Sequence, residues 1–234
     1  AVGASYPITM IFMAIAVGSN IGCSVIISQY FGAKWYEKMK TAIYTTLIAS
    51  VALSLLLTAA GLLGSRAMMA AINTPENIFA DGALYLRIYI GGFVFLFLYN
   101  VATGIFNSMG DSRTPLYFLI GSSLGNIVLD LIFVAVFHWD VAGVAWATFI
   151  AQGIACVLAL NALRKRLASI ETEGKVELFS WNMLGRISRI AVPSILQQSF
   201  ISVGNIFIQG LINSYGSSVI AGYSAAIKLN TFCI

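Results

Sequence analysis

Residues 114–137 read TPLYFLIGSSLGNIVLDLIFVAVF, and Asp130 is the only charged side chain among them. A bilayer-spanning helix needs about 20 consecutive apolar residues, so this stretch is long enough to cross a membrane. An ionised Asp near the middle of such a helix costs about 2.5–3.5 kcal/mol on insertion scales. Carboxylates in this position usually face the protein interior and mark ion or substrate pathways, which makes Asp130 the first candidate for a functional residue.

The rest of the chain has the same membrane character. Of its 234 residues, 59% are hydrophobic and 9% are charged, compared with about 25% charged residues in soluble domains. Further runs without charge cover residues 1–33, 41–65, 88–110, 141–163 and 190–227. The runs are continuously apolar instead of alternating over about ten residues, which favours helices over a barrel. We expect an all-α integral membrane protein, a polytopic helical bundle with six spans.

Lys and Arg are divided unevenly between alternate loops. Ten of the 13 fall in one set of loops, Arg66 and Arg87 fall in the other, and Lys228 follows the last run. Because cytoplasmic loops carry the excess of basic residues, residue 1 is predicted to lie outside the plasma membrane and residues 168–181 in the cytoplasm. The same bias explains the net charge of +4 without a nucleic-acid partner. We expect these basic residues to meet anionic lipid heads.

Local signals divide the chain further. Residues 164–181 mix basic and acidic side chains and predict a solvated linker between two lobes. Two helix starts are predicted by a capping residue followed by proline, at Thr74-Pro75 and at residues 112–115 (SRTP). Small-xxx-small pairs, typical of close helix packing, occur at Gly18 with Gly22 and at residues 121 and 125.

The surroundings of Asp130 suggest an ion site. Asn126 precedes it by one helical turn and shares its face. Asp130 and Thr148 each lie seven residues from a short loop that joins two antiparallel helices, so both are about 10 Å below the outer surface. A carboxylate, an amide and a hydroxyl at one depth suit a hard cation or a desolvated proton acceptor. The alternative is a structural hydrogen-bond cluster between packed helices.

Several segments resemble one family, the multidrug and toxic compound extrusion (MATE) transporters. Residues 124–130 (LGNIVLD), followed by 141–148 (VAGVAWAT), are similar to the fifth and sixth helices of that family. Residues 24–33 (SVIISQYFGA) resemble the end of its second helix, and residues 107–115 (NSMGDSRTP) resemble its cytoplasmic turn between helices four and five. The resemblance covers essentially the whole chain.

This resemblance implies a twelve-helix protein of two six-helix lobes. Residues 1–167 would form most of the N-terminal lobe, residues 168–181 the cytoplasmic linker, and residues 182–234 the start of the C-terminal lobe. Residues 221–226 (AGYSAA) echo residues 1–6 (AVGASY), as a duplicated lobe would. The first helix, which carries another coupling carboxylate in many family members, would precede residue 1. The ion site is then expected to need the remainder of the protein's own chain.

The resemblance also implies a function. The expected activity is cation-coupled antiport, in which a proton or a sodium ion drives the export of organic cations, drugs or toxic metabolites by alternating access. Asp130 would titrate or compensate the ion's charge, Asn126 would supply a carbonyl ligand and Thr148 a hydroxyl ligand. No cofactor is expected beyond the coupling ion.

Glutamines in the apolar runs are candidates to line the substrate cavity, although Gln in a bundle more often makes hydrogen bonds between helices. They are Gln29, Gln152, Gln197, Gln198 and Gln209.

Two alternatives remain at this point. A flippase for lipid-linked oligosaccharides, from the same superfamily, is expected to need cationic cavity residues for pyrophosphate, and the apolar runs carry almost none. A membrane-embedded enzyme would need a catalytic constellation that one His and one buried Asp do not supply. Cys23, Cys156 and Cys233 are too scattered for a metal or disulfide motif, so we expect packing roles. The chain is therefore not expected to be an enzyme.

Overall fold

The computed structural model describes residues 2–71, 76–137, 139–172 and 174–214. In this part of the chain every regular element is helical, which confirms the all-α prediction. The elements are α1 (Val2–Gly32), α2 (Tyr36–Ala71), α3 (Glu76–Ser108), α4 (Arg113–Leu131), the π-helical segment η1 (Ile132–Val136), α5 (Asp140–Ala168) and α6 (Trp181–Ser214).

Five helical stretches are long and apolar enough to cross a membrane among the described residues. They are Ile8–Gly32, Tyr36–Ser65, Gly82–Ser108, Arg113–Val136 and Ala142–Ala168. The chain is thus a multi-pass membrane protein. The sixth expected run, residues 190–227, lies partly outside the described residues, and α6 is not one of the five.

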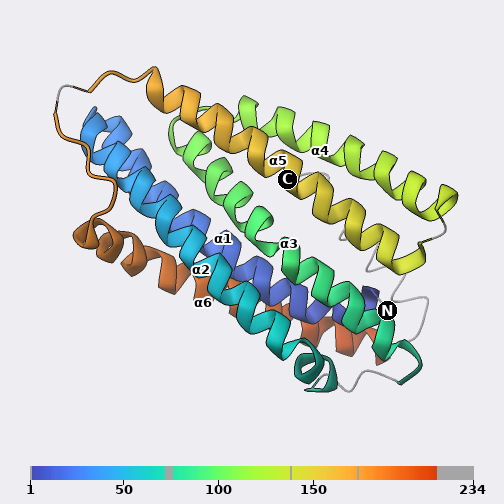
Figure 1. Ribbon diagram of the computed structural model, residues 1–234. Coiled ribbons are helices and arrows are strands. Elements are labelled where there is room, and N and C mark those ends of the chain that lie inside the picture. The colour runs from blue at the N-terminus through green and yellow to red at the C-terminus, as the bar shows by residue number, and fades with distance from the viewer. Residues whose placement is uncertain (1, 72–75, 138, 173, 215–234) are drawn as a thin grey trace.

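The helices pack side by side in an elongated bundle (Figure 1). Helix α1 contacts α2, α3 and α6, and α3 packs between α1 and α5. Helix α4 packs against α5 at the edge of the bundle, and none of its most apolar part is buried. As expected from the short loop between them, α4 and α5 are neighbours.

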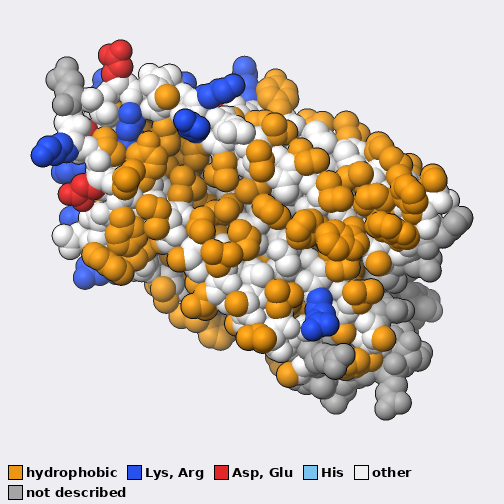
Figure 2. Space-filling model, viewed as in Figure 1, with side chains coloured by type: hydrophobic (Ala, Val, Ile, Leu, Met, Phe, Trp, Pro, Cys, Tyr) orange, Lys and Arg blue, Asp and Glu red, His pale blue; other side chains and the backbone are white. Residues whose placement is uncertain are grey.

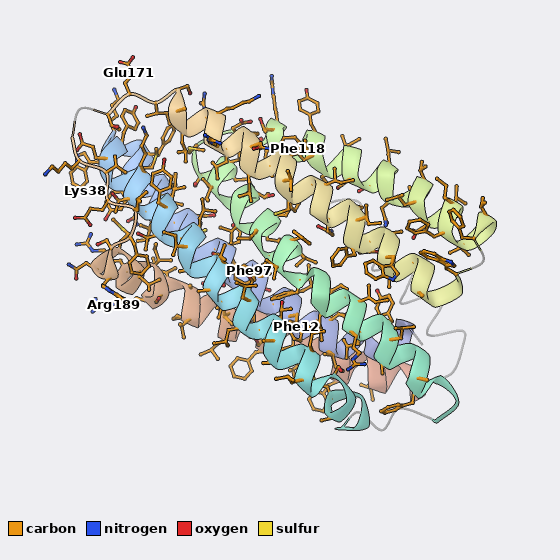
Figure 3. All side chains as sticks on the ribbon, in the orientation of Figure 1. Phe12, Lys38, Phe97, Phe118, Glu171 and Arg189 are labelled. Atoms are coloured by element: carbon orange, nitrogen blue, oxygen red, sulfur yellow. The ribbon has the colours of Figure 1, made fainter. Side chains whose placement is uncertain are left out.

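Aromatic side chains fill the interior between α1 and α3. Phe12 and Phe93 meet edge to face with ring centroids 4.9 Å apart, and Phe97 extends the cluster at 5.6 Å from Phe93. Phe12 and Phe97 lie within the bundle in Figure 3. Edge-to-face pairs add about 0.5–1.5 kcal/mol beyond the burial of their area, so this cluster fixes α1 against α3.

The predicted close helix packing is confirmed at Gly18 and Gly22. The described chain shows no such contact at Gly121 and Gly125. A Cβ on Gly18 would come within 2.5 Å of the Ile195 Cα, and Gly22 lies equally tightly against Ala191. These two glycines therefore bring the backbones of α1 and α6 together. In contrast, a Cβ on Gly121 or Gly125 would meet nothing within 4 Å in the described chain, because α4 lies at the edge of the bundle.

The predicted cap of α4 needs a correction. The helix begins at Arg113, but the Ser112 side chain makes no capping hydrogen bond. Instead Asp111 accepts hydrogen bonds from the Thr114 backbone N–H at 3.1 Å and from the Thr114 hydroxyl at 2.7 Å. These bonds lower the pKa of Asp111, which lies outside the spans. Gly110 makes the preceding turn possible with a φ of 79°. The other predicted start, Thr74-Pro75, lies outside the described residues.

Basic side chains gather at one end of the molecule, while hydrophobic side chains cover its middle (Figure 2). This end is formed by the α1–α2 turn, the end of α5 and the start of α6. Lys38, Glu171 and Arg189 mark it in Figure 3. The segment between α5 and α6, residues 169–180, crosses this end and is called the strap below. The predicted sidedness of the membrane and the lobe boundary at the strap stay predictions.

Candidate functional site

Four buried polar side-chain atoms lack a hydrogen-bond partner in the described part of the chain. They are Thr103 Oγ1, Asn126 Nδ2, Asp130 Oδ1 and Gln152 Oε1. Thr103 lies on α3, Asn126 and Asp130 lie on α4, and Gln152 lies on α5, which packs against both α3 and α4. An unpaired buried polar group costs about 1–3 kcal/mol, and most such groups in native proteins are paired. Asn126 and Asp130, one turn apart on α4, are therefore the first candidates for a site that takes an ion, a proton or water.

Helix α4 supplies the carboxylate of this region. Asp130 and Asn126 are half-buried and one turn apart. The helix widens directly after Asp130 into η1, where the Phe137 N–H donates to the Ile132 carbonyl at 3.1 Å, an i to i−5 bond. Single π-helical turns within α-helices are frequent at functional sites. This irregular turn begins two residues after Asp130.

A small cavity lies beside this region, between α3 and α5. Its walls include Tyr85 and Tyr89 from α3 and Thr148, Phe149 and Gln152 from α5. Its volume is about 10 Å³. One water molecule needs roughly 10–15 Å³ on the same measure, so the space suits a water or a small ion and is far too small for a drug.

Oxygen atoms dominate the polar lining of this cavity. The Thr148 hydroxyl donates to the Val144 carbonyl of its own helix at 3.0 Å, which leaves its oxygen free to accept. Gln152 adds the unpaired Oε1. Carboxylate, amide and hydroxyl oxygens are the donors that hard cations such as sodium prefer. In the described residues no group of three His, Cys, Asp or Glu side chains could hold another metal, and Cys23 and Cys156 are free and buried.

The structure places Asn126 and Asp130 on α4 and Thr148 on α5, two helices that pack against each other. No hydrogen bond connects Asn126, Asp130 and Thr148 among the described residues. Their role in holding one ion stays a prediction.

Tyr85 and Thr103 were not found from the sequence. Tyr85 precedes the charge-free run at residues 88–110, and Thr103 is a single hydroxyl inside it. Neither has a spacing that sets it apart from an ordinary packing residue. The packing of α3 against α5 is what places Tyr85 at the small cavity with Thr148 and Gln152.

The glutamines separate into different environments. Gln152 lines the small cavity. Gln29 and Gln197 are exposed in the structure of this chain, and Gln198 is half-buried. The Gln209 side chain lies outside the described residues. A large substrate cavity lined by these residues therefore stays a prediction.

Comparison with known proteins identifies the family and agrees with the fold. The MatE family profile matches residues 1–132. A probable multidrug resistance protein YpnP of Bacillus subtilis is 29% identical over 232 residues, which are 99% of this chain and 52% of that protein. A multidrug export protein MepA of Staphylococcus haemolyticus is 26% identical over 99% of this chain and 51% of its own length. The chain spans about half the length of the curated relatives it matches.

Solved structures show the same fold. An outward-facing conformation of a multidrug resistance MATE family transporter of the MOP superfamily superposes with a TM-score of 0.87 and 24% identity, over 99% of this chain and 52% of the other. An inward-facing conformation gives a TM-score of 0.79 and 23% identity, over 98% of this chain and 53% of the other. The helices of this chain thus have the arrangement of about half of such a transporter.

Proposed function

The chain belongs to the MatE family, and from this premise we propose that the complete protein exports organic cations, drugs or toxic metabolites in exchange for a proton or a sodium ion. The relatives named as multidrug resistance and multidrug export proteins support the substrate class. The observation that carries the coupling is Asp130, a half-buried carboxylate within a membrane span whose Oδ1 has no hydrogen-bond partner among the described residues.

The proposed coupling follows from the cost of a bare charge. An ionised Asp130 in the span costs about 2.5–3.5 kcal/mol. If one helix packing exposes Asp130 to water and another buries it, this free energy changes the ratio of the two populations by roughly a hundredfold. A proton or a sodium ion removes this cost. Binding would therefore shift the lobe between two arrangements, and a gradient of the ion would drive alternating access.

Each site residue has a proposed part in that step. Asp130 takes the proton or balances the charge of the sodium ion. Asn126 and Thr148 contribute neutral oxygens, and the small cavity between Tyr85 and Gln152 provides room for one water or ion. A cationic substrate would compete for the same negative field, and this competition makes the exchange obligatory.

We also propose the placement of the chain in the whole protein. Residues 1–167 would belong to the N-terminal lobe, residues 168–181 would link the lobes in the cytoplasm, and residues 182–234 would begin the C-terminal lobe. The coverage of about half of each relative supports this division. Basic side chains gather at the end of the molecule that carries the strap (Figure 2). This supports a strap on the cytoplasmic side of the plasma membrane.

The decisive experiment is transport by the complete protein in vesicles. A panel of fluorescent lipophilic cations, ethidium among them, is loaded, and a proton or a sodium gradient is imposed separately. Substrate movement that follows one gradient supports the proposal and identifies the ion. No movement of any cation under either gradient, together with restored growth of a flippase-deficient strain, would instead favour the export of lipid-linked oligosaccharides.

A further inference from the structure

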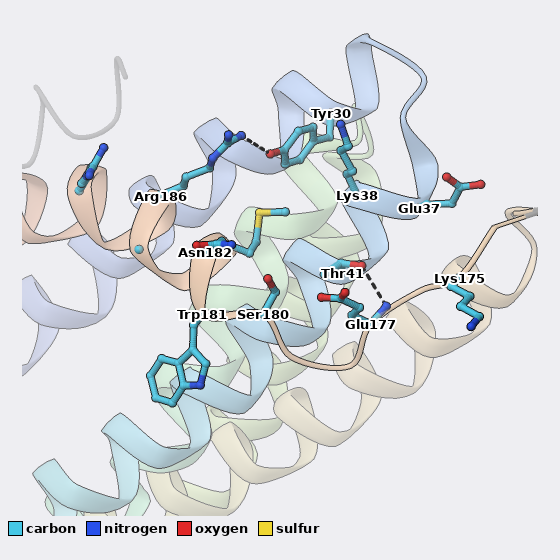
Figure 4. Close-up of a pocket in the computed structure, with 13 residues that line it drawn as sticks. Tyr30, Glu37, Lys38, Thr41, Lys175, Glu177, Ser180, Trp181, Asn182 and Arg186 are labelled. Carbon is cyan, nitrogen blue, oxygen red and sulfur yellow. Dashed lines mark hydrogen bonds between the residues drawn. The ribbon is translucent and has the colours of Figure 1, made fainter.

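A large cavity lies at the basic end of the molecule, far along the helices from the Asp130 region. Its volume is about 640 Å³. Figure 4 shows that its walls come from three separate segments: the end of α1, the start of α2, and the strap with the first turns of α6. Pockets that bind small molecules typically measure about 300–1,000 Å³. The cavity is therefore large enough for a ligand.

Among the described residues the lining has an excess of positive charge. They contribute four basic side chains, those of Lys38, Lys175, Arg186 and Arg189, and two carboxylates, those of Glu37 and Glu177. Glu37 is already engaged, because its Oε1 accepts the Gly174 backbone N–H at 2.8 Å.

The basic side chains themselves are largely uncommitted. In the described part of the chain, Lys175 and Arg189 have neither a hydrogen bond nor an ion pair. Arg186 donates one bond, to the Tyr30 hydroxyl at 3.0 Å, and Lys38 lies 4.3 Å from the centre of the Trp35 ring. A guanidinium has five N–H donors and an ammonium has three, so most of the donors in this cavity are available to an anion.

Hydrogen bonds between the strap and α2 hold the walls of the cavity in place. The Glu177 N–H donates to the Thr41 hydroxyl at 3.2 Å, as drawn in Figure 4, and the Ser180 N–H donates to the Thr45 hydroxyl at 3.1 Å. Lys40 Nζ donates to the Ile170 carbonyl at 2.6 Å. These bonds fasten the strap to α2 at Ile170, Glu177 and Ser180. The positions of Lys175 and α6 relative to Lys38 are therefore set by the fold.

We propose that this cavity binds the phosphate group of an anionic ligand, either the head of an anionic phospholipid or a soluble phosphate. Arg and Lys recognise phosphate through charge-assisted hydrogen bonds, and Arg can do so with two parallel bonds. The first turn of α6 opens on the cavity at Asn182, and the N-terminus of a helix adds partial positive charge. Bound phosphate would connect α2, the strap and α6.

The rim of the cavity favours the lipid as the source of the phosphate. Trp181, which is part of the lining, is 78% exposed, and Leu178, three residues earlier in the strap, is 69% exposed. Trp is enriched where a membrane protein meets the headgroup layer. A lipid head could place its phosphate among the basic side chains while its chains lie along this apolar rim.

Binding to the full-length protein in detergent tests the proposal. The probes are short-chain phosphatidylglycerol, short-chain phosphatidylcholine and inorganic phosphate, and native mass spectrometry and a titration report binding. The cavity variant is Lys38→Gln with Arg189→Gln, which keeps the Arg186 bond to Tyr30. The matched control is Arg164→Gln with Lys165→Gln, which removes the same charge from the same end but outside the cavity lining.

We expect phosphatidylglycerol to bind, and the cavity variant to bind it about twentyfold more weakly, because each basic residue near an anionic surface is equivalent to about fivefold in affinity. The control should change affinity less than about twofold. Binding of phosphatidylglycerol alone identifies a lipid head, and equal binding of inorganic phosphate identifies a soluble anion.

Equal losses in the cavity variant and the control, or no binding of either phosphate probe, would overturn the proposal. If the double variant does not fold, Lys175→Gln replaces it, since Lys175 has no partner among the described residues. That single change should weaken binding about fivefold, and an unchanged affinity would contradict the site.

Discussion

Gly22 of α1 lies directly against Ala191 of α6, so close that a Cβ added to Gly22 would come within 2.6 Å of the Ala191 Cα. Gly18, one turn earlier, lies against Ile195 in the same way. The two helices are separated by most of the chain, and these glycines let α6 pack closely against α1. Close approach of backbones is the usual means by which membrane helices associate.

Gly22→Val should therefore destabilise the protein by overpacking. Inserting side-chain atoms into a tight contact costs about 1–3 kcal/mol, because α1 and α6 must move apart. Thermal unfolding of the full-length protein in detergent measures the loss. Gly121→Val is the control, because a Cβ at Gly121 meets nothing within 4 Å in the described chain. Equal melting temperatures for both variants would show that the α1–α6 contact is loose.

The second prediction concerns the rate of backbone amide hydrogen exchange in the strap. Thr41→Val and Thr45→Val each remove the hydroxyl that accepts a strap N–H, those of Glu177 and Ser180. A typical hydrogen bond contributes about 0.5–1.5 kcal/mol, so amide exchange in the strap should accelerate by about two- to tenfold for each variant. Hydrogen exchange with mass spectrometry follows the strap peptide.

Thr46→Val is the matched control for this experiment. The Thr46 hydroxyl donates to the Ala42 carbonyl of its own helix at 2.7 Å and does not contact the strap. Exchange in the strap should stay at the unmodified rate. If Thr41→Val leaves strap exchange unchanged, the strap is held by other contacts and does not form a fixed wall of the basic cavity.

The spans could be predicted from the sequence, but the ends of the helices could not. Apolar runs identify the membrane part because lipid demands it. Helix α2 nevertheless begins at Tyr36, before Lys38 and Lys40, although the charge-free run begins at residue 41. A helix satisfies its backbone equally well in water, and long basic side chains extend to the interface from within it. A charge-free run therefore locates the part of a helix that lies in the bilayer and does not locate the ends of the helix.

The sidedness of the membrane is the third prediction. In a protein freed of Cys23, Cys156 and Cys233, one cysteine is introduced at Ser169 in the strap or at Asn73 between α2 and α3. An impermeant maleimide added to whole cells should label the Asn73 position and spare Ser169, because the excess of basic residues lies on the strap side. Labelling both positions after the cells are opened is the control. Preferential labelling of Ser169 in intact cells would reverse the orientation.

Asp130→Asn is the fourth prediction. The change keeps the shape of the side chain and removes its charge, so the complete protein should insert and bind substrate. It should lose gradient-driven efflux by about tenfold or more, since neutralising a bare charge in the span removes a bias of roughly a hundredfold. Vesicle transport with an imposed proton or sodium gradient measures the rate.

Asp111→Asn is the matched control, because Asp111 lies outside the spans and caps α4 through Thr114. Asn is as good a cap as Asp, so transport should continue. Unmodified transport and unchanged ion dependence in Asp130→Asn would make Asp130 a structural residue.

The candidate site could be predicted in part, for a physical reason. Asp130 and Asn126 are recognisable because a carboxylate and an amide are costly in an apolar helix. Tyr85 and Gln152 depend on how α3 packs against α5, which no local pattern contains. The strap is harder still, since Thr41 and Glu177 are 136 residues apart in the chain. Sequence patterns show which residues have a high free energy in lipid. The tertiary fold decides which residues each of them contacts.

The last prediction separates ligands of one ion from independent polar residues. Asn126→Ala and Thr148→Ala should each raise the ion concentration needed for half-maximal transport, because the loss of one neutral ligand costs about 1–3 kcal/mol, or roughly 5- to 150-fold in affinity. Ser122→Ala is the control on α4, since its hydroxyl bonds only to the Leu119 carbonyl of its own helix.

The double variant Asn126→Ala with Thr148→Ala decides whether the two residues act on the same ion. Residues that share a ligand show interaction energies of about 0.5–3 kcal/mol, whereas independent residues add within about 0.3–0.5 kcal/mol. We therefore expect the ion dependence of the double variant to differ from the sum of the single effects. Strict additivity, measured in the same vesicles with the same gradient, would place Asn126 and Thr148 at separate positions and leave Asp130 without them as partners.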